Sequence, residues 1–256
     1  MQHLIRQPFN IDPVLARALP QVTLAGPTLA AEALQFFDGA LSRANFDPVT
    51  GDVVEITDYS TNGQNITPVS GFVPTIDPGA RPPRGQAQAV VSMAGDGILY
   101  LGADFPDDTS WTKVVAFRPD VAAMTGVVAK IWSSSVGNSN IHRLAIFNGS
   151  LFHTVGSAGS FVQLDLPITS VWTYAVASWN DSTKLLRLGL RDTAPISMTG
   201  TTQDVINSDH YLGGDSAEAT FHGDIGPALL LSGDAYDDTA QMARIHEFFE
   251  AAIGRA

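Results

Sequence analysis

The sequence contains no cysteine. Disulfide bonds and thiolate metal sites are therefore excluded as sources of stability. The chain does not need such cross-links, because its 256 residues, 45% of them hydrophobic, are enough to bury the core of one large domain. We therefore expect a globular protein held together by its hydrophobic core.

Positive charge is also scarce. Only 14 Lys and Arg residues stand against 26 Asp and Glu residues, which gives a formal net charge of −12. A protein that binds nucleic acid needs a basic face to displace counterions from the phosphates, and attraction to anionic lipid headgroups needs basic clusters too. We therefore exclude nucleic acid as a partner and do not expect binding to an anionic lipid surface.

Long apolar runs are missing as well. The first twenty residues, "MQHLIRQPFNIDPVLARALP", lack the unbroken apolar core of a signal peptide. No segment approaches the roughly 20 apolar residues of a membrane-spanning helix. We expect a protein that does not insert into membranes, and that is either cytoplasmic or leaves the cell by a route that reads no N-terminal signal.

The N-terminal segment, residues 1–33, differs from the rest in its proline content. Prolines stand at Pro8, Pro13, Pro20 and Pro27, with apolar residues between them. Proline fixes φ and removes a hydrogen-bond donor, so no long helix is expected here. The segment is nevertheless too apolar for a solvated linker. We predict an extended arm that either straps over its own domain or docks on another subunit or a larger assembly.

Residues 34–235 alternate short β-rich runs with turns of Gly, Asp, Asn and Ser. The run "HRLAIFNGSLFHTVG" predicts a hairpin, because the Asn148-Gly149 dipeptide tolerates positive φ at both central turn positions. Closely spaced short strands without crossover helices favour an antiparallel β-sandwich and exclude a parallel α/β fold. The prediction is therefore an all-β protein.

The C-terminal residues 236–256 show a helical pattern. Apolar residues recur at helical spacing in "DDTAQMARIHEFFEAAIG", Asp237 or Asp238 can cap the start, and Gly254 can end the helix. We predict one helix packed on the sandwich. Its apolar stripe is expected to contact the core, and a subunit interface is the alternative.

Several segments in order resemble the laminin-G-like, concanavalin A-like jelly rolls. They are "WTYAVASWNDSTKLLRLGL" and "YLGGDSAEATFHGDIGPALLL". Upstream, "VVEITDYSTNGQNITP" and "VVSMAGDGILYLG" look like segments of sandwich domains in phage structural proteins. The sequence departs from the pattern at Ile56, where a Trp is common, and at Gly226-Pro227, where an acidic pair is usual. Since proline cannot donate to a ladder, Pro227 predicts a strand edge or a β-bulge.

The resemblance admits enzymes, but the residues do not supply their motifs. Glucanases of this superfamily carry two or more closely spaced carboxylates on one strand, whereas Glu55 and Asp58, three apart, would face opposite sides of a strand. The alginate lyases use a strand motif that "NIHRLAIF" matches only in part, with Asn140 in the first place. We interpret His142 as an ordinary surface residue of a strand and assign no catalytic residue.

A carbohydrate-binding surface needs an exposed aromatic ring with polar neighbours. Trp132 precedes the polar stretch "SSSVGNSN", which fits the rim of a sandwich, and Asn138 and Asn140 follow it. Tyr59 with Asn62 is a second candidate for sugar contact. The other tryptophans start or end apolar strands and are expected in the core: Trp111, Trp172 and Trp179.

No cofactor is required by any motif, although calcium is possible. Calcium prefers several converging oxygen ligands, which acidic loops can supply. Asp104, Asp107 and Asp108 are the candidate ligands. The alternative is that these residues stabilise turns, as Asp often does.

The resemblance implies a virion structural protein, such as a tail-fibre, spike or head-decoration subunit, that is assembled in the host cytoplasm. Its sandwich is expected to contact cell-surface glycan, its arm to bind other virion proteins, and its subunits to form a homo-oligomer. The alternatives are a polysaccharide-active enzyme of the same fold, either a glycosidase or a lyase, and a purely architectural module.

Overall fold

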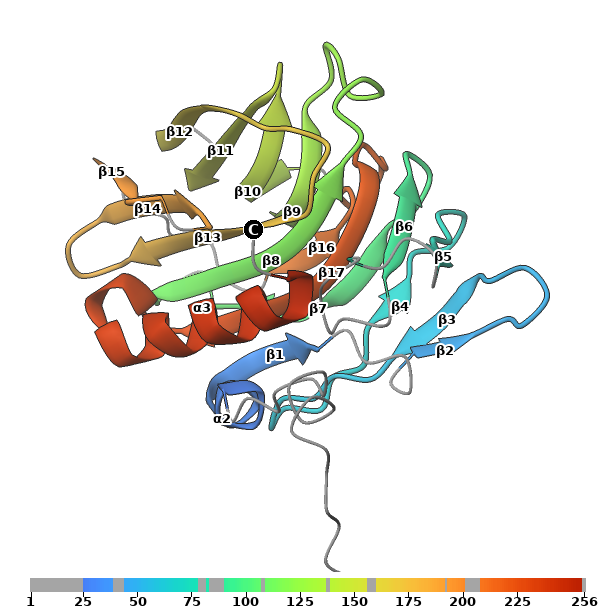
Figure 1. Ribbon diagram of the computed structural model, residues 1–256, viewed down its shortest axis with the longest axis horizontal. Coiled ribbons are helices and arrows are strands. Elements are labelled where there is room, and N and C mark those ends of the chain that lie inside the picture. Colours follow the sequence, from blue (N-terminus) through green and yellow to red (C-terminus); the bar gives the residue numbers. More distant parts are fainter. Residues whose placement is uncertain are drawn as a thin grey trace, which may run out of the picture.

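The computed structural model describes residues 25–38, 44–77, 82, 90–106, 109–136, 139–155, 160–191, 193–200 and 208–254. Figure 1 shows two β-sheets packed face to face, with helices against the outer face of one of them. The prediction of an all-β antiparallel sandwich with a C-terminal helix is confirmed.

The first sheet has eight strands in the described part of the chain, and all of its pairings are antiparallel. Its order is β15-β14-β13-β8-β17-β6-β5, and β1 also pairs with β17. The bounds are β1 (Ala33–Phe37), β5 (Thr75–Ile76), β6 (Val91–Ala94), β8 (Trp111–Pro119), β13 (Thr173–Asn180), β14 (Leu185–Leu190), β15 (Ile196–Thr199) and β17 (His222–Ser232).

The second sheet has seven strands among the described residues, in the order β12-β11-β10-β9-β16-β7-β4. The bounds are β4 (Thr67–Pro68), β7 (Leu99–Phe105), β9 (Ala129–Val136), β10 (Ser139–Phe147), β11 (Ser150–Val155), β12 (Ser160–Pro167) and β16 (Ser208–Leu212). The predicted hairpin joins β10 and β11, with positive φ at Asn148 and Gly149. A separate hairpin of β2 (Ala44–Phe46) and β3 (Val53–Ile56) projects at the right of Figure 1.

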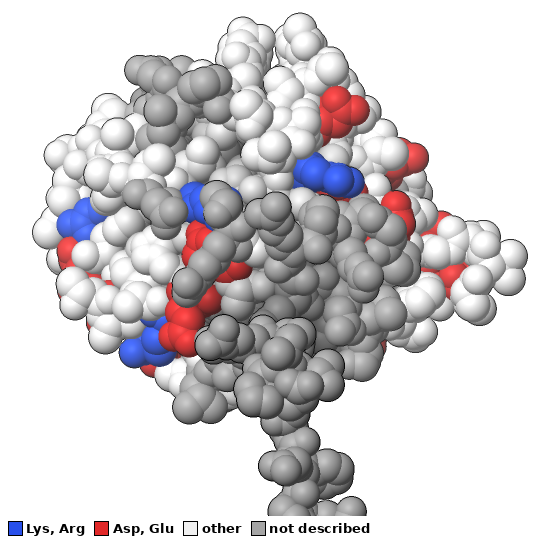
Figure 2. Space-filling view, in the orientation of Figure 1, with Lys and Arg blue, Asp and Glu red and all other residues white. Residues whose placement is uncertain are grey.

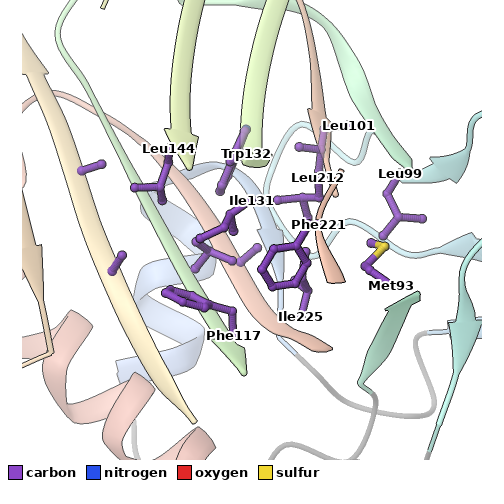
Figure 3. Close-up of a cluster of buried hydrophobic side chains, with 14 of the residues drawn as sticks. Met93, Leu99, Leu101, Phe117, Ile131, Trp132, Leu144, Leu212, Phe221 and Ile225 are labelled. Atoms are coloured by element: carbon purple, nitrogen blue, oxygen red, sulfur yellow. The ribbon is translucent and has the colours of Figure 1, made fainter. Parts of the chain in front are cut away.

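The core lies between the sheets, where side chains from both layers meet (Figure 3). Phe117 and Ile225 of the first sheet face Leu144 and Leu212 of the second. The first sheet is also covered on its outer face, where Val114 of β8 lies under the helices. Burial on both faces explains why its central strands are almost continuously apolar rather than alternating.

The predicted C-terminal helix is α3 (Thr239–Ile253), which follows a short 3-10 turn, η3 (Ala235–Asp237). The Asp238 carboxylate caps its first turn by accepting from the backbone amides of Ala240 and Gln241. Gly254, with a φ of 83°, ends it. The apolar stripe packs on the outer face of the first sheet through Ile245, Phe249, Ala252 and Ile253, so the expected core contact is confirmed.

The expectation of an extended arm over residues 1–33 is wrong for residues 25–33. Residues Ala25–Glu32 form a short helix, α2, and Ala33 begins β1. Pro27 is accommodated because it lies in the first turn, where no intrahelical amide donor is needed. Glu32 pairs with Arg244 of α3 at 2.8 Å, which ties this segment to its own domain. Residues 1–24 lie outside the described part of the chain.

Pro227 lies at a β-bulge in β17, which is one of the two alternatives predicted for it, a strand edge or a β-bulge. The register of β17 against β8 shifts between Ile225 and Ala228. On its other side β17 pairs with β6 up to Ile225 and with β1 from Ala228 onward. Proline therefore lies where β17 changes its neighbour, so the missing amide donor breaks no regular ladder. Among the described residues, neither α2 nor α3 has the length and apolarity of a membrane-spanning helix.

Candidate functional site

A polar groove lies at one end of the outer face of the first sheet, beyond the helices. We call it the Arg118 groove, and its volume is about 480 Å³. It is built from β6, the end of β8, the start of β17 and one loop residue. Its lining residues are Ser92, Met93, Ala94, Arg118, Pro119, Asp120, Ser170, His222, Gly223 and Asp224.

An ion pair forms the floor of the groove. Asp224 and Arg118 are directly opposite each other on β17 and β8, and Ser92 of β6 is opposite Asp224 on the other side. Arg118 Nε donates to Asp224 Oδ2 at 2.7 Å, and Nη2 lies 2.5 Å from the same oxygen. Burial raises the pKa of Asp224, although hydrogen bonds from Arg118 and Ser92 and the charge of Arg118 lower it.

Trp172 lies beside this ion pair. The guanidinium carbon of Arg118 is 5.9 Å from the centre of its ring. Trp172 also lines a second, more apolar pocket of about 360 Å³, to which Val171 contributes a side chain that is 58% exposed. Ser170 lines the groove, and its chain neighbours Thr169 and Val171 line the pocket, so the two hollows adjoin.

Glycine allows the strands to approach closely here. At Gly223 an added Cβ would lie 2.3 Å from the carbonyl oxygen of Arg118, and its φ of 139° disfavours other residues. At Gly95 an added Cβ would lie 2.2 Å from the His222 ring. The amide of Asp120 donates to the carbonyl of His222 at 2.9 Å. The groove is therefore held by backbone contacts between strands as well as by the ion pair.

The groove offers both donors and acceptors. Arg118, Ser92 and Ser170 supply N–H and O–H groups, and Asp120 and Asp224 supply carboxylate oxygens. Asp120 is exposed and His222 is half-buried, so both can reach a bound molecule. Such a mixture of donors and acceptors can hold a small polyhydroxylated ligand. The neighbouring Trp172 is only 8% exposed and belongs to the core under the helices, as expected from the sequence.

The expectation that Trp132 exposes its ring is wrong. Its side chain is 1% exposed, and it lies inside the sandwich (Figure 3). The reason is that β9 continues through the polar serines to Val136, so Trp132 lies within the strand rather than at the rim. It is opposite Leu144 and Leu212 of the neighbouring strands, at an inward-facing position.

The other predicted sugar contacts are only partly described. Asn138 lies outside the described residues, and Asn140 lies on β10 opposite Ser135, with its side chain outside the description. Tyr59 is 45% exposed, and the Asn62 side-chain amide donates to the carbonyl of Leu34 at 2.9 Å. Neither Tyr59 nor Asn62 lines the Arg118 groove. Their binding of sugar stays a prediction.

The buried carboxylate of Asp58 organises the loop that carries Tyr59. It accepts hydrogen bonds from the backbone amides of Phe36 at 2.9 Å, Ser60 at 2.9 Å and Gln64 at 3.0 Å. Its role is therefore that of a loop-stabilising acceptor, which satisfies backbone donors that would otherwise be buried without a partner.

The calcium prediction lies mostly outside the description. The structure places Asp104 on β7 without describing its side chain, and Asp107 and Asp108 are outside the described residues. In the described part of the chain, no three His, Asp or Glu side chains gather as a metal site would require. Calcium binding at the three aspartates stays a prediction.

The interpretation of His142 as a surface residue is wrong. His142 and Lys113 are completely buried between the sheets, and His153 and His210 lie beside them. The Lys113 ammonium nitrogen is 4.5 Å from the ring centre of Phe105, and aromatic rings of Trp111 and Trp132 complete its surroundings. The sequence does indicate that His142 is buried, because side chains alternate along β10 and His142 therefore shares its face with the apolar Leu144 and Ile146.

Burial also changes the protonation of these histidines. It lowers the pKa of both His153 and His210 to about 3, and the charge of Lys113 lowers the pKa further in the same direction. The carbonyl of Arg143, 3.2 Å from His153 Nδ1, opposes this shift only in part. Both imidazoles are therefore neutral near pH 7, and the cluster forms part of the core.

The Arg118 groove is not predicted from the sequence. Its residues come from segments far apart in the chain, so no local motif marks them. The available signal is one charged residue near an end of each of two apolar strands, Arg118 near the end of β8 and Asp224 near the start of β17.

Neither a protein-family model nor a curated protein sequence matches this chain. Solved structures do match its fold. Domain 4 of AbnA, a GH43 extracellular arabinanase from Geobacillus stearothermophilus solved with arabinotriose, has a TM-score of 0.55 and 13% identity, covering 75% of this chain and 91% of that one. The botulinum neurotoxin serotype D ligand-binding domain, solved with N-acetylneuraminic acid, has a TM-score of 0.55 and 13% identity.

That second match covers 90% of this chain and 53% of the neurotoxin domain, so the chain spans about half of it. The sialidase of Trypanosoma rangeli, solved with sialic acid, has a TM-score of 0.56 and 12% identity, and the match covers 86% of this chain but 33% of the sialidase. At these identities the likenesses show the fold alone. The chain is a β-sandwich of the kind found in these carbohydrate-binding and glycoside-active proteins.

Proposed function

We propose that this chain is a glycan-binding module without catalytic residues, and that the sugar binds in the Arg118 groove. The observation that carries the proposal is the polar groove of about 480 Å³ that adjoins Trp172 on the outer face of the first sheet. The carbohydrate ligands of the similarly folded structures support it as an analogy of fold.

The chemistry of the groove suits a sugar. Each sugar hydroxyl both donates and accepts, and the groove presents carboxylate oxygens of Asp120 and Asp224 close to the N–H groups of Arg118. The apolar pocket beside Trp172 offers a surface for the C–H faces of a second residue in an oligosaccharide.

The ion pair at the floor of the groove favours binding over catalysis. Glycoside hydrolysis uses a pair of carboxyl groups on opposite sides of the scissile bond. Asp224 is the buried carboxylate of the groove, and Arg118 and Ser92 already bind it. This arrangement suits an acceptor fixed in place better than an acid or nucleophile that must exchange a proton or form a bond.

The test is a glycan array probed with the purified chain, followed by titration calorimetry on the strongest ligand. The variant His222→Ala is expected to weaken binding about tenfold, and Glu247→Ala, an exposed residue of α3 outside the groove, is the matched control. The proposal fails if no glycan binds or if His222→Ala binds as well as the unchanged chain. Release of reducing or unsaturated sugars from the bound glycan would instead favour a glycosidase or lyase.

A finer proposal concerns the biological setting. We propose a homo-oligomeric virion subunit, anchored to other virion proteins by the segment before α2, and the resemblance of several segments to phage structural proteins supports it. Because residues 25–37 are part of the folded domain, the anchor is assigned to residues 1–24. Deleting residues 1–24 should abolish incorporation into particles and leave thermal unfolding unchanged. Incorporation of the truncated chain would contradict this role.

We also propose that calcium binds at Asp104, Asp107 and Asp108. If it binds there, adding calcium should raise the melting temperature, and Asp107→Asn combined with Asp108→Asn should remove the effect. An unchanged melting temperature in millimolar calcium would contradict it.

A further inference from the structure

The lining of the Arg118 groove is acidic despite its arginine. Its charged side chains are one arginine, Arg118, and two aspartates, Asp120 and Asp224. With histidine counted as neutral, the described lining therefore carries one formal negative charge. The whole chain adds a field of the same sign, because its formal net charge is −12.

The charge of Arg118 is already paired. Two of its nitrogens lie 2.7 Å and 2.5 Å from the same oxygen of Asp224, and its guanidinium lies next to Trp172. Displacing Asp224, whose side chain is only 8% exposed, would leave that carboxylate without its counter-ion, which is strongly unfavourable. A ligand carboxylate is therefore limited to the N–H groups that Asp224 does not use, on a guanidinium whose charge is already neutralised.

Among the described residues, no continuous basic patch adds to Arg118 on the face drawn in Figure 2. Figure 2 shows that the Lys and Arg groups on this face are separated from one another, with Asp or Glu atoms beside them, and that they form no continuous basic patch among the residues coloured. Asp120 is exposed and lines the groove, so an acidic ligand bound there would lie near its carboxylate.

We propose that the ligand of the Arg118 groove is a neutral sugar with neighbouring free hydroxyl groups, and that sialic and uronic acids are selected against. The inference rests on the proposed glycan-binding function and specifies its ligand class. Adjacent hydroxyls donate to the carboxylates of Asp120 and Asp224, and a hydroxyl oxygen accepts from a free N–H of Arg118, so the ion pair stays intact. Aspartate thereby sets the specificity by attraction to hydroxyl donors and by repulsion of carboxylates.

The experiment uses an array that contains matched glycans with and without a terminal sialic acid, such as lactose and sialyllactose. The full chain should bind neutral members at least tenfold better than their sialylated partners. This preference should weaken as salt rises from about 0.02 M to 0.5 M, because screening reduces the repulsion of the acidic member.

The variant Asp120→Lys should shift the ratio of sialylated to neutral binding upward by about tenfold at low salt, since it reverses a charge at the mouth of the groove. Glu247→Lys makes the same charge change on α3, outside the groove, and should leave the ratio within about twofold. Melting temperatures of both variants confirm that they fold.

The outcomes separate the two proposals. Preferential binding of sialylated glycans by the unchanged chain would overturn the neutral-sugar inference and leave the glycan-binding function standing. Equal shifts of the ratio in Asp120→Lys and Glu247→Lys would also overturn it, because a charge in the groove would then have no greater effect on selectivity than a charge outside it. Absence of binding to every glycan would overturn the proposed function itself.

Discussion

The Asp224 carboxylate accepts a 2.7 Å hydrogen bond from Arg118 Nε between neighbouring strands, on the face opposite the core. The pair has two effects. It joins β17 to β8 next to the bulge at Pro227, and it fixes an arginine and an aspartate side by side at the floor of a groove. A substitution of Asp224 or Arg118 should therefore change both the stability of the fold and the affinity for glycan.

Asp224→Asn should lower the free energy of unfolding by about 1 kcal/mol and weaken glycan binding. The stability effect is modest because Arg118 is 39% exposed, so solvent already screens part of the attraction. Urea unfolding measures the first effect and calorimetry the second. Glu218→Gln is the control, since it removes an exposed carboxylate 3.4 Å from Lys130 and should change stability by less than about 0.5 kcal/mol. Unchanged binding by Asp224→Asn would contradict the role of the pair.

Stability should fall as the pH decreases below about 6.5. His153 and His210 have folded pKa values of about 3, below the 6.5 of the unfolded chain. The unfolded state therefore binds more protons below pH 6.5, and acid favours it. Above pH 6.5 neither histidine affects the balance. Between pH 6 and pH 5 each should contribute a loss on the order of 1 kcal/mol per pH unit.

The measurement is the free energy of unfolding by urea at pH 7, 6 and 5. His210→Phe should make the decline shallower, whereas Trp132→Phe, which changes a buried ring beside His210 without removing a titratable group, should leave the slope unchanged. A stability that is constant from pH 7 to pH 5 would show that the interior histidines are accessible to protons in the folded state.

Gly223→Ala should destabilise the fold by about 3 kcal/mol or more, because the added Cβ would lie 2.3 Å from a backbone oxygen that cannot move without separating β17 from β8. Gly149→Ala is the matched control. It also has positive φ, at 78°, but no atom lies within 4 Å of the added Cβ, so the loss should be about 1 kcal/mol. Equal losses in thermal unfolding would contradict the close approach.

Trp132→Phe should fold and bind glycan with unchanged affinity, because Trp132 lies inside the sandwich and is 1% exposed. Trp132→Ala should lose about 3–5 kcal/mol of stability through the cavity that it creates. Array binding and chemical denaturation report the two effects. A selective loss of glycan affinity in well-folded Trp132→Phe would restore Trp132 as a contact residue.

Local sequence patterns were sufficient for much of the fold. Short-range alternation indicated the strands, Asn148-Gly149 marked one hairpin, and the spacing in Thr239–Ile253 marked the helix. These signals are readable because each depends on neighbouring residues only. The short helix at Ala25–Glu32 differs from the predicted extended arm, because proline excludes a long helix but is tolerated in a first turn.

The candidate site could not be predicted in the same way. Arg118 and Asp224 are 106 residues apart in sequence, and only the pairing of β8 with β17 brings them together. Trp132 failed as a predicted contact for a related reason: the length of β9, rather than the polarity of the following residues, decides whether it lies at the rim. Exposure depends on which strands pair, and that is a property of the whole sheet.

Glycan binding in the Arg118 groove is tested most directly by a nuclear magnetic resonance titration of the isotope-labelled chain with the strongest neutral glycan from the array. We expect the backbone amide signals of Arg118, Asp120, His222 and Asp224 to shift on binding, and His222→Ala to weaken the response. Shifts confined to other regions, such as the loop of Tyr59 and Asn62, or no shifts at all, would contradict glycan binding in the Arg118 groove.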